Sequence, residues 1–277
     1  MRQLTYRSFT EKGDHRRFMR TKKATLKHKV CILLGLGFLV SGCTSTMKPR
    51  GPIWYVPAKN TRVIGIGVNV FSAHSATNST VNGIRFELIG PGILIPFVPE
   101  AVSPATETRG SYLSHLSYPG ENVYGLELSG AGTRIRGHVT GISLCLIGGV
   151  KNRVTGIVGT LGFNSARDVT GLQFGAFNST YRTAGVQAGF ENRTSELEGL
   201  QIGVFNGSRD GAGLQLGGFN STYRAAGVQA GFDNRATKLK GLQIGVFNGC
   251  ADGHGIQIGL WNTNDRRSLP IINWTWK

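Results

Sequence analysis

The chain has 277 residues, of which 40% are hydrophobic, 41 are glycine and 9 are proline. This length allows one or two domains with a core, and the few prolines exclude a collagen-like chain. Residues 1–42 hold ten Lys/Arg and two Asp/Glu, and the remaining 21 Lys/Arg and 13 Asp/Glu give the rest of the chain +8, so half of the formal net charge of +16 belongs to the N-terminal segment. Because no run of Lys or Arg follows residue 50, we expect no nucleic-acid partner.

The N-terminal segment has the pattern of a secretory signal peptide. Residues 20–29 are strongly basic, residues 30–40 (VCILLGLGFLV) are apolar without interruption, and Ser41-Gly42 precede Cys43. A basic region, a short apolar region and small residues before the cleavage site are typical of such peptides, and this apolar run is short for a membrane-spanning helix. We therefore predict a lipoprotein-type signal peptide over residues 1–42, with Met19 as the true start.

The residues around Cys43 resemble the bacterial lipobox. Val40-Ser41-Gly42-Cys43 follows its order of an aliphatic residue, two small residues and cysteine. The resemblance implies lipidation of Cys43, for example with palmitate, and a membrane partner held through this N-terminal lipid. The residue after the cysteine is Thr44 rather than Asp, which resembles lipoproteins that are retained in the outer membrane. We therefore expect a location in the outer membrane or at the cell surface.

The rest of the chain is expected to contain a tether and two β-rich regions. Residues 43–60 are polar and contain proline, which predicts a lipid-anchored tether. Residues 61–134 predict an irregular β region with long loops, because stretches such as Gly83–Leu88 alternate apolar and charged residues between segments rich in Pro, Gly and Ser. Residues 135–277 predict a 14-residue β-repeat region with a C-terminal cap.

One eight-residue phrase recurs seven times between residues 171 and 262. It reads GLQFGAFN, GVQAGFEN, GLQIGVFN, GLQLGGFN, GVQAGFDN, GLQIGVFN and GIQIGLWN, and its starts are always 14 residues apart, at Gly171, Gly185, Gly199, Gly213, Gly227, Gly241 and Gly255. We number the phrase from position 1 to position 8, and the six residues after it are positions 9 to 14. Positions 2, 4 and 6 are mostly apolar, whereas position 3 is always Gln and position 5 is always Gly.

This alternation predicts one strand and one turn in each unit, with positions 2, 4 and 6 facing the core. We expect an all-β fold, a repetitive β-solenoid-like stack of 14-residue strand-turn units, because an insertion would break the cross-section of a solenoid and none occurs. In such a stack the Gln at position 3 and the Asn at position 8 would form amide ladders. The alternative is an antiparallel β-meander or barrel, in which successive strands pair as hairpins.

The phrase also resembles a family of bacterial surface-repeat proteins with GLQIGLxN-like units, which are often exported or lipidated. The resemblance covers residues 123–277 and is most specific in residues 171–274, where Gly255–Asn262 and the following Leu269–Trp274 are similar to the end of members of the family. It implies surface exposure and repetition. It implies no established activity and no catalytic residues.

Two columns of the repeat are candidate binding surfaces. The Gln column is either a repetitive binding face or a structural ladder, and it consists of Gln173, Gln187, Gln201, Gln215, Gln229, Gln243 and Gln257. The aromatic column at position 7 is either an exposed strip that stacks on glycans or a filler of the core, and it consists of Phe177, Phe205, Phe219, Phe247 and Trp261. Glu191 and Asp233 interrupt this column.

No pattern in the sequence indicates catalysis. Nucleophile-elbow, zinc-protease, Walker and dinucleotide-binding motifs are absent from the sequence. The histidines are not placed with carboxylates or cysteines at metal-ligand spacing. We therefore expect no enzyme, no catalytic residue, no metal and no cofactor. Cys145 and Cys250 could form one disulfide or remain two free thiols.

Together these patterns indicate a lipid-anchored surface or outer-membrane protein whose β-repeat body has a structural or interaction role. A glycan or a host or surface protein would be the partner, and the ligand stays open. The alternative function is that of a transmembrane β-barrel outer-membrane protein, with the repeats as membrane strands.

Overall fold

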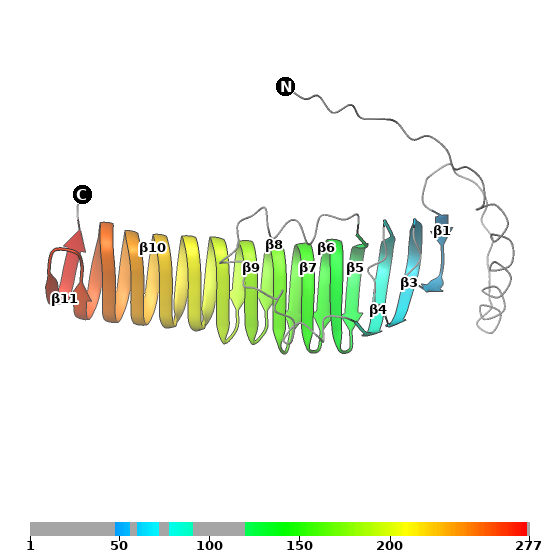
Figure 1. Cartoon of the computed structure of the whole chain (residues 1–277), viewed down its shortest axis with the longest axis horizontal. Helices are drawn as coiled ribbons and strands as arrows, with labels where there is room; N and C mark the ends of the chain where they lie inside the picture. The colour runs from blue at the N-terminus through cyan, green and yellow to red at the C-terminus, as the bar shows by residue number, and fades with distance from the viewer. Residues whose placement is uncertain (1–47, 56–59, 72–77, 91–119, 276–277) are drawn as a thin grey trace, which may run out of the picture. The chain divides into compact units, whose positions relative to one another are not determined.

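Strands that follow one another in the sequence lie side by side in one long stack of coils (Figure 1). The computed structural model describes residues 48–55, 60–71, 78–90 and 120–275. The strands are β1 (Lys48–Arg50), β2 (Ile53–Tyr55), β3 (Thr61–Phe71), β4 (Thr80–Ile89), β5 (Asn122–Ser129), β6 (Gly132–Cys145), β7 (Gly148–Thr160), β8 (Phe163–Phe174), β9 (Phe177–Ala188), β10 (Glu191–Thr263) and β11 (Ser268–Thr275).

The pairing between strands is parallel from β1 to β10, and only β11 runs antiparallel to its neighbour. The sheet follows the order of the sequence, with β2 as a second partner of β3. Parallel stacking of consecutive coils is a β-solenoid, so the expected fold class is confirmed. The antiparallel meander and the barrel are therefore not the fold of the described strands.

The first glycine of the phrase sets the register of the coils. Gly171 pairs with Gly185, and Gly185 pairs with Gly199. These glycines have φ values of 127°, 136° and 140°, which side-chain-bearing residues rarely adopt. A Cβ atom on Gly185 would also collide with the carbonyl oxygen of Gly171. A glycine is thus required at this point of these coils, which explains why the phrase begins with glycine.

The interior of the repeat region is polar, so the expectation that positions 2, 4 and 6 face the core is wrong. Gln201 and Asn206, at positions 3 and 8, are buried, whereas Ile202 and Val204 are 43% and 41% exposed. Alternation correctly placed the apolar residues on one side of the strand and the Gln on the other, but the Gln side is the interior. Hydrogen bonds between stacked amides satisfy these buried groups, which makes a polar core tolerable.

Apolar core residues form small clusters elsewhere in the stack. One cluster fills the coils of β5 to β8 and contains Val123, Ile135, Val139, Val154, Val158, Ala166 and Val169. A second cluster in β10 contains Ala225, Ala236, Leu239 and Cys250. The strands predicted in the irregular region, β3, β4 and β5, belong to the same stack as the repeats.

Several sequence-based predictions lie outside the described residues. They are the signal peptide, the lipidation site Cys43 and the first part of the tether. In the part of the chain that the structure describes, there is no helix of the length and apolarity needed to cross a membrane.

Candidate binding surfaces

The glutamine column is a hydrogen-bonded ladder inside the coils. All seven glutamine side chains are at most 3% exposed. Each Nε2 donates to the Oε1 of the glutamine 14 residues earlier, over 2.7 to 2.9 Å, from Gln187 onto Gln173 through to Gln257 onto Gln243. The binding-face interpretation is therefore wrong, because a ligand outside the solenoid cannot reach these amides. The ladder interpretation is confirmed.

The asparagine at position 8 forms a second ladder. Nδ2 of Asn192 donates to Oδ1 of Asn206 at 2.9 Å and to the carbonyl oxygen of Ile202 at 2.9 Å. Asn164 to Asn248 repeat the contact with the next asparagine. A Cβ on Gly203, at position 5, would collide with the carbonyl oxygen of Gly189 and would meet the amide nitrogen of Asn192 at 2.6 Å. The close backbone of the preceding coil and the asparagine ladder together explain why position 5 is always glycine in the phrase.

The aromatic column is an unbroken ladder on the outside of the solenoid. Ring centroids of consecutive coils lie 4.8 to 6.3 Å apart along Phe163, Phe177, Phe190, Phe205, Phe219, Phe232 and Phe247. From Phe177 onward these rings are 36% to 51% exposed, and Trp261 in the next coil is 49% exposed. The core-filler interpretation is therefore wrong, since about half of each ring faces solvent.

Two members of this aromatic ladder, Phe190 and Phe232, were missed by reasoning from the sequence. They occupy position 6, in the two units whose position 7 is acidic. Their rings make T-shaped contacts with the position 7 rings of the coils on both sides. The signal that could have found them is this exchange itself. Where Glu191 or Asp233 takes position 7, phenylalanine moves to position 6, so every coil keeps one ring.

Charged pairs lie beside the aromatic ladder at the same two places. Arg193 forms an ion pair with Glu191, and Arg235 forms one with Asp233 at 2.9 Å. Both arginines are well exposed, with side-chain exposures of 56% and 75%. Each pair therefore offers guanidinium donors and carboxylate acceptors to solvent next to exposed rings.

A groove of about 620 Å³ joins these features near the C-terminal end of the solenoid. Its lining includes Phe232, Asp233, Arg235, Phe247, Gly249 and Trp261. Gly249 forms an open floor, because a Cβ there would have its nearest neighbour 3.9 Å away. The residues 42 positions earlier repeat this set as Phe190, Glu191, Arg193, Phe205, Gly207 and Phe219. The same combination of rings, ion pair and bare glycine therefore occurs twice along the ladder.

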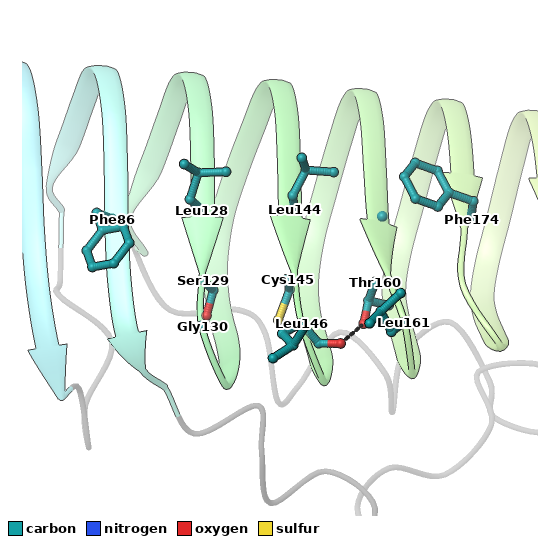
Figure 2. Close-up of a pocket in the computed structure, with 11 residues that line it drawn as sticks. Phe86, Leu128, Ser129, Gly130, Leu144, Cys145, Leu146, Thr160, Leu161 and Phe174 are labelled. Atoms are coloured by element: carbon teal, nitrogen blue, oxygen red, sulfur yellow. Dashed lines mark hydrogen bonds between the residues drawn. The ribbon is translucent and has the colours of Figure 1, made fainter.

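A second surface is the aliphatic face formed by positions 2 and 4. Figure 2 shows its N-terminal part, where the side chains of Phe86, Leu128, Leu144 and Phe174 lie in a row. A groove of about 430 Å³ lies there, since Gly159 occupies position 4 of its coil and leaves a gap that the Phe174 ring partly fills. The groove has almost no polar lining, so it could hold only an apolar group.

Buried charges replace the glutamine ladder in the N-terminal coils. Arg85 contacts Glu121, Glu87 and Glu127 at 2.8, 2.9 and 3.3 Å. Burial lowers the pKa of Arg85, but the three carboxylates outweigh this and raise the pKa above its usual value.

The pKa values of two of these carboxyl groups are shifted in opposite directions. Burial raises the pKa of Glu121. Burial also acts to raise the pKa of Glu127, but Lys151, Arg85 and two hydroxyl donors outweigh it, so that pKa lies below its usual value. The cluster is enclosed, so we assign it to holding the coils together rather than to binding. Arg85 and Glu127 occupy the column that holds glutamine at position 3 of the phrase. Charged residues in this column are the sequence signal that could have revealed the cluster.

The two described cysteines are free and buried. Cys145 Sγ donates to the carbonyl oxygen of Gly148, and Cys250 Sγ donates to that of Asp252, both at 2.9 Å. Burial raises the pKa of both thiols. Of the two arrangements left open by the sequence, the structure has two free thiols.

The described residues contain no group of three or more His, Cys, Asp or Glu side chains that could hold a metal ion. Comparisons with protein-family models, with curated proteins and with solved structures gave no significant match. A functional proposal must therefore come from the surfaces described above.

Proposed function

We propose that this protein is a lipid-anchored outer-membrane or cell-surface protein whose solenoid binds an extended polysaccharide along the aromatic ladder. The observation that carries the proposal is the continuity of half-exposed rings, one from each coil, kept even where positions 6 and 7 exchange roles. Large exposed apolar patches on monomers usually mark interaction sites, and this row of rings is such a patch.

Sugar rings fit the chemistry of this ladder. The C–H faces of a β-linked pyranose chain are apolar and stack on aromatic rings, while its hydroxyl groups need donors and acceptors at the side. The ladder offers rings 4.8 to 6.3 Å apart, comparable with the length of one sugar unit, and the Arg235–Asp233 pair stands beside them. Arg193 and Glu191 supply the same pair three coils earlier.

The binding part of the proposal is tested with β-1,4-linked hexasaccharides of glucose and of N-acetylglucosamine as probes. We expect at least one of them to bind in calorimetry, and Phe205→Ala to weaken binding about fivefold, or about 1 kcal/mol. Phe86→Ala is the matched control, because Phe86 is similarly exposed, at 40% against 41%, but lies outside the ladder. Equal losses in the two variants, or no binding by either hexasaccharide, would overturn the proposal.

The anchor is tested separately with Cys43→Ala. We expect the variant to lose incorporation of labelled palmitate and to leave the membrane fraction, and proteolysis of intact cells then reports which side the solenoid faces. The lipid anchor is refuted if the variant stays in the membrane after carbonate extraction. That result would leave the polysaccharide proposal untouched, since the two tests use different residues.

A further inference from the structure

We infer that two copies of this chain pair antiparallel through the aliphatic face of the repeats, with the two-fold axis between the coils that begin at Gly213 and Gly227. This dimer face is defined as positions 2, 4 and 6 of the seven phrases, with position 14 at its border and β11 at its end. It meets the aromatic ladder at position 6, where Phe190 and Phe232 belong to both surfaces, and the inference does not depend on sugar binding.

The dimer face is apolar over its whole length. Position 2 holds Leu172, Val186, Leu200, Leu214, Val228, Leu242 and Ile256, and position 4 holds Phe174, Ala188, Ile202, Leu216, Ala230, Ile244 and Ile258. The larger side chains protrude, with Ile202, Ile244 and Ile258 about 40% exposed. β11 extends the face, because Ile272 and Trp274 pair with Ile258 and Ile256 and are also exposed. An uncharged face of this size is unusual on a monomer.

The area is sufficient for a stable dimer. Eight strands spaced about 4.8 Å apart give a length of about 34 Å, and the six residue steps from position 14 to position 6 give a width of about 20 Å. Each copy would then cover about 700 Å², and the pair about 1,400 Å², which lies within the roughly 1,200–2,000 Å² of specific interfaces. Two sheets packed face to face in this way resemble the halves of a β-sandwich.

The sizes of the side chains are compatible with this position of the axis. A two-fold axis across the stack between the Gly213 and Gly227 coils places Leu216 opposite the partner copy's Ala230. It also places Ala188 opposite the partner copy's Ile258. At these two pairs a large side chain faces a small one, which allows close packing, while Ile202 faces the partner copy's Ile244. Moving the axis one coil toward the N-terminus would place Ala188 opposite the partner copy's Ala230, leaving a gap.

The charges at the border select this axis. Position 14 holds Thr170, Ala184, Glu198, Ala212, Ala226, Lys240 and His254. Glu198 and Lys240 are exposed, and they point to the same side of the strand as position 2 because they precede it by two residues. Glu198 also accepts hydrogen bonds from Arg182 of its own copy at 2.9 Å, and its exposed carboxylate leaves room for a second cation. Glu198 and Lys240 lie three coils apart, so an axis midway between them brings each beside the other residue of the partner copy. Opposite charges arranged in this way fix the register of an interface.

The test is sedimentation of the full chain carrying Cys43→Ala, so that no lipid adds to association. We expect a dimer at micromolar concentration, since interfaces of this size commonly reach such affinity. Ile202→Arg should abolish it. Leu144→Arg is the matched control, because Leu144 occupies the same column with 37% exposure but lies in a coil that has no opposite coil in this pairing. Circular dichroism checks that each variant is folded.

A charge exchange tests the axis. Glu198→Lys and Lys240→Glu should each weaken the dimer at least tenfold, because each places like charges together twice. The double variant should restore it, and Lys238→Glu, which makes the same change two residues away from the border, should have no effect. A monomeric parent chain, equal effects of Ile202→Arg and Leu144→Arg, or a double variant that stays dissociated would overturn the inference. Flotation of a monomeric chain with lipid vesicles, lost in Ile202→Arg, would assign the face to a bilayer instead.

Discussion

Replacing Gln215 with leucine tests whether the amide ladder holds the repeats together. Gln215 Nε2 donates to Gln201 Oε1 at 2.7 Å and to Ser208 at 3.3 Å, and its Oε1 accepts from Gln229 and Thr222, both at 2.8 Å. Leucine has a similar volume but can form none of these four bonds. The variant therefore leaves the buried Gln201 Oε1 without its ladder donor.

The expected loss follows from the bonds that Gln215 makes. A buried polar group without a partner costs about 1–3 kcal/mol, and Gln201 Oε1 is left in this state, whereas the Thr222 hydroxyl and Gln229 Nε2 each lose one bond and keep another. Taking about 1 kcal/mol for each of these lost bonds and allowing about 1 kcal/mol for the added apolar burial, we expect Gln215→Leu to destabilise the protein by about 3 kcal/mol.

The end of the ladder provides the control. Gln173 is equally buried but accepts a single side-chain bond, from Gln187 at 2.9 Å, and its own Nε2 has no partner. Gln187 also keeps a bond to Thr180 at 3.0 Å. Gln173→Leu should therefore cost about 1 kcal/mol or less.

Urea unfolding followed by circular dichroism, together with amide exchange around residues 199–229, measures both effects, because repeat arrays can unfold in parts. Equal stability of the two variants, or a gain in stability for Gln215→Leu, would refute the reasoning. The interior would then be held by packing and not by the ladder.

Three further outcomes follow from the structure. Gly213→Ala should cost at least about 2 kcal/mol in urea unfolding, because its φ is +143° and its Cβ would strike the Gly199 carbonyl oxygen, whereas Gly207→Ala, at an open position, should cost little. The lowered pKa of Glu127 means that its stabilising contribution is present above an unfolded pKa of about 4.3 and is lost as the pH falls through the lower folded value. Glu127→Gln should therefore lower stability at pH 7 by about 3 kcal/mol and flatten the loss of stability in acid, and a pH series of unfolding midpoints that is unchanged would contradict this. Cys145 and Cys250 should react with a thiol reagent only after unfolding, because burial raises the pKa of both thiols, and rapid reaction of the native protein would show that these coils are open.

Much of the fold could be predicted from the repeat itself. The constant 14-residue spacing indicated a stack of equal coils, and parallel pairing of β8, β9 and β10 in that register confirms it. The glutamine ladder was also predictable, because a polar residue repeated at one point of a stack meets its own copies. The buried cluster around Arg85 was not predictable in this way, since its acidic partners come from different coils and include Glu121, which lies outside the alternating pattern.

The side of the strand that faces inward was decided only by the tertiary structure. Period-two alternation shows that Leu200 and Ile202 share one side and that Gln201 lies on the other, but it does not state which side is the interior. Hydrophobicity alone favours the leucine side, and that expectation was wrong. Stacking every 14 residues gives each buried Gln and Asn a partner, so the polar side can be enclosed without unpaired groups. The same folding leaves the apolar columns and the phenylalanine ladder outside, where the two proposed binding surfaces lie.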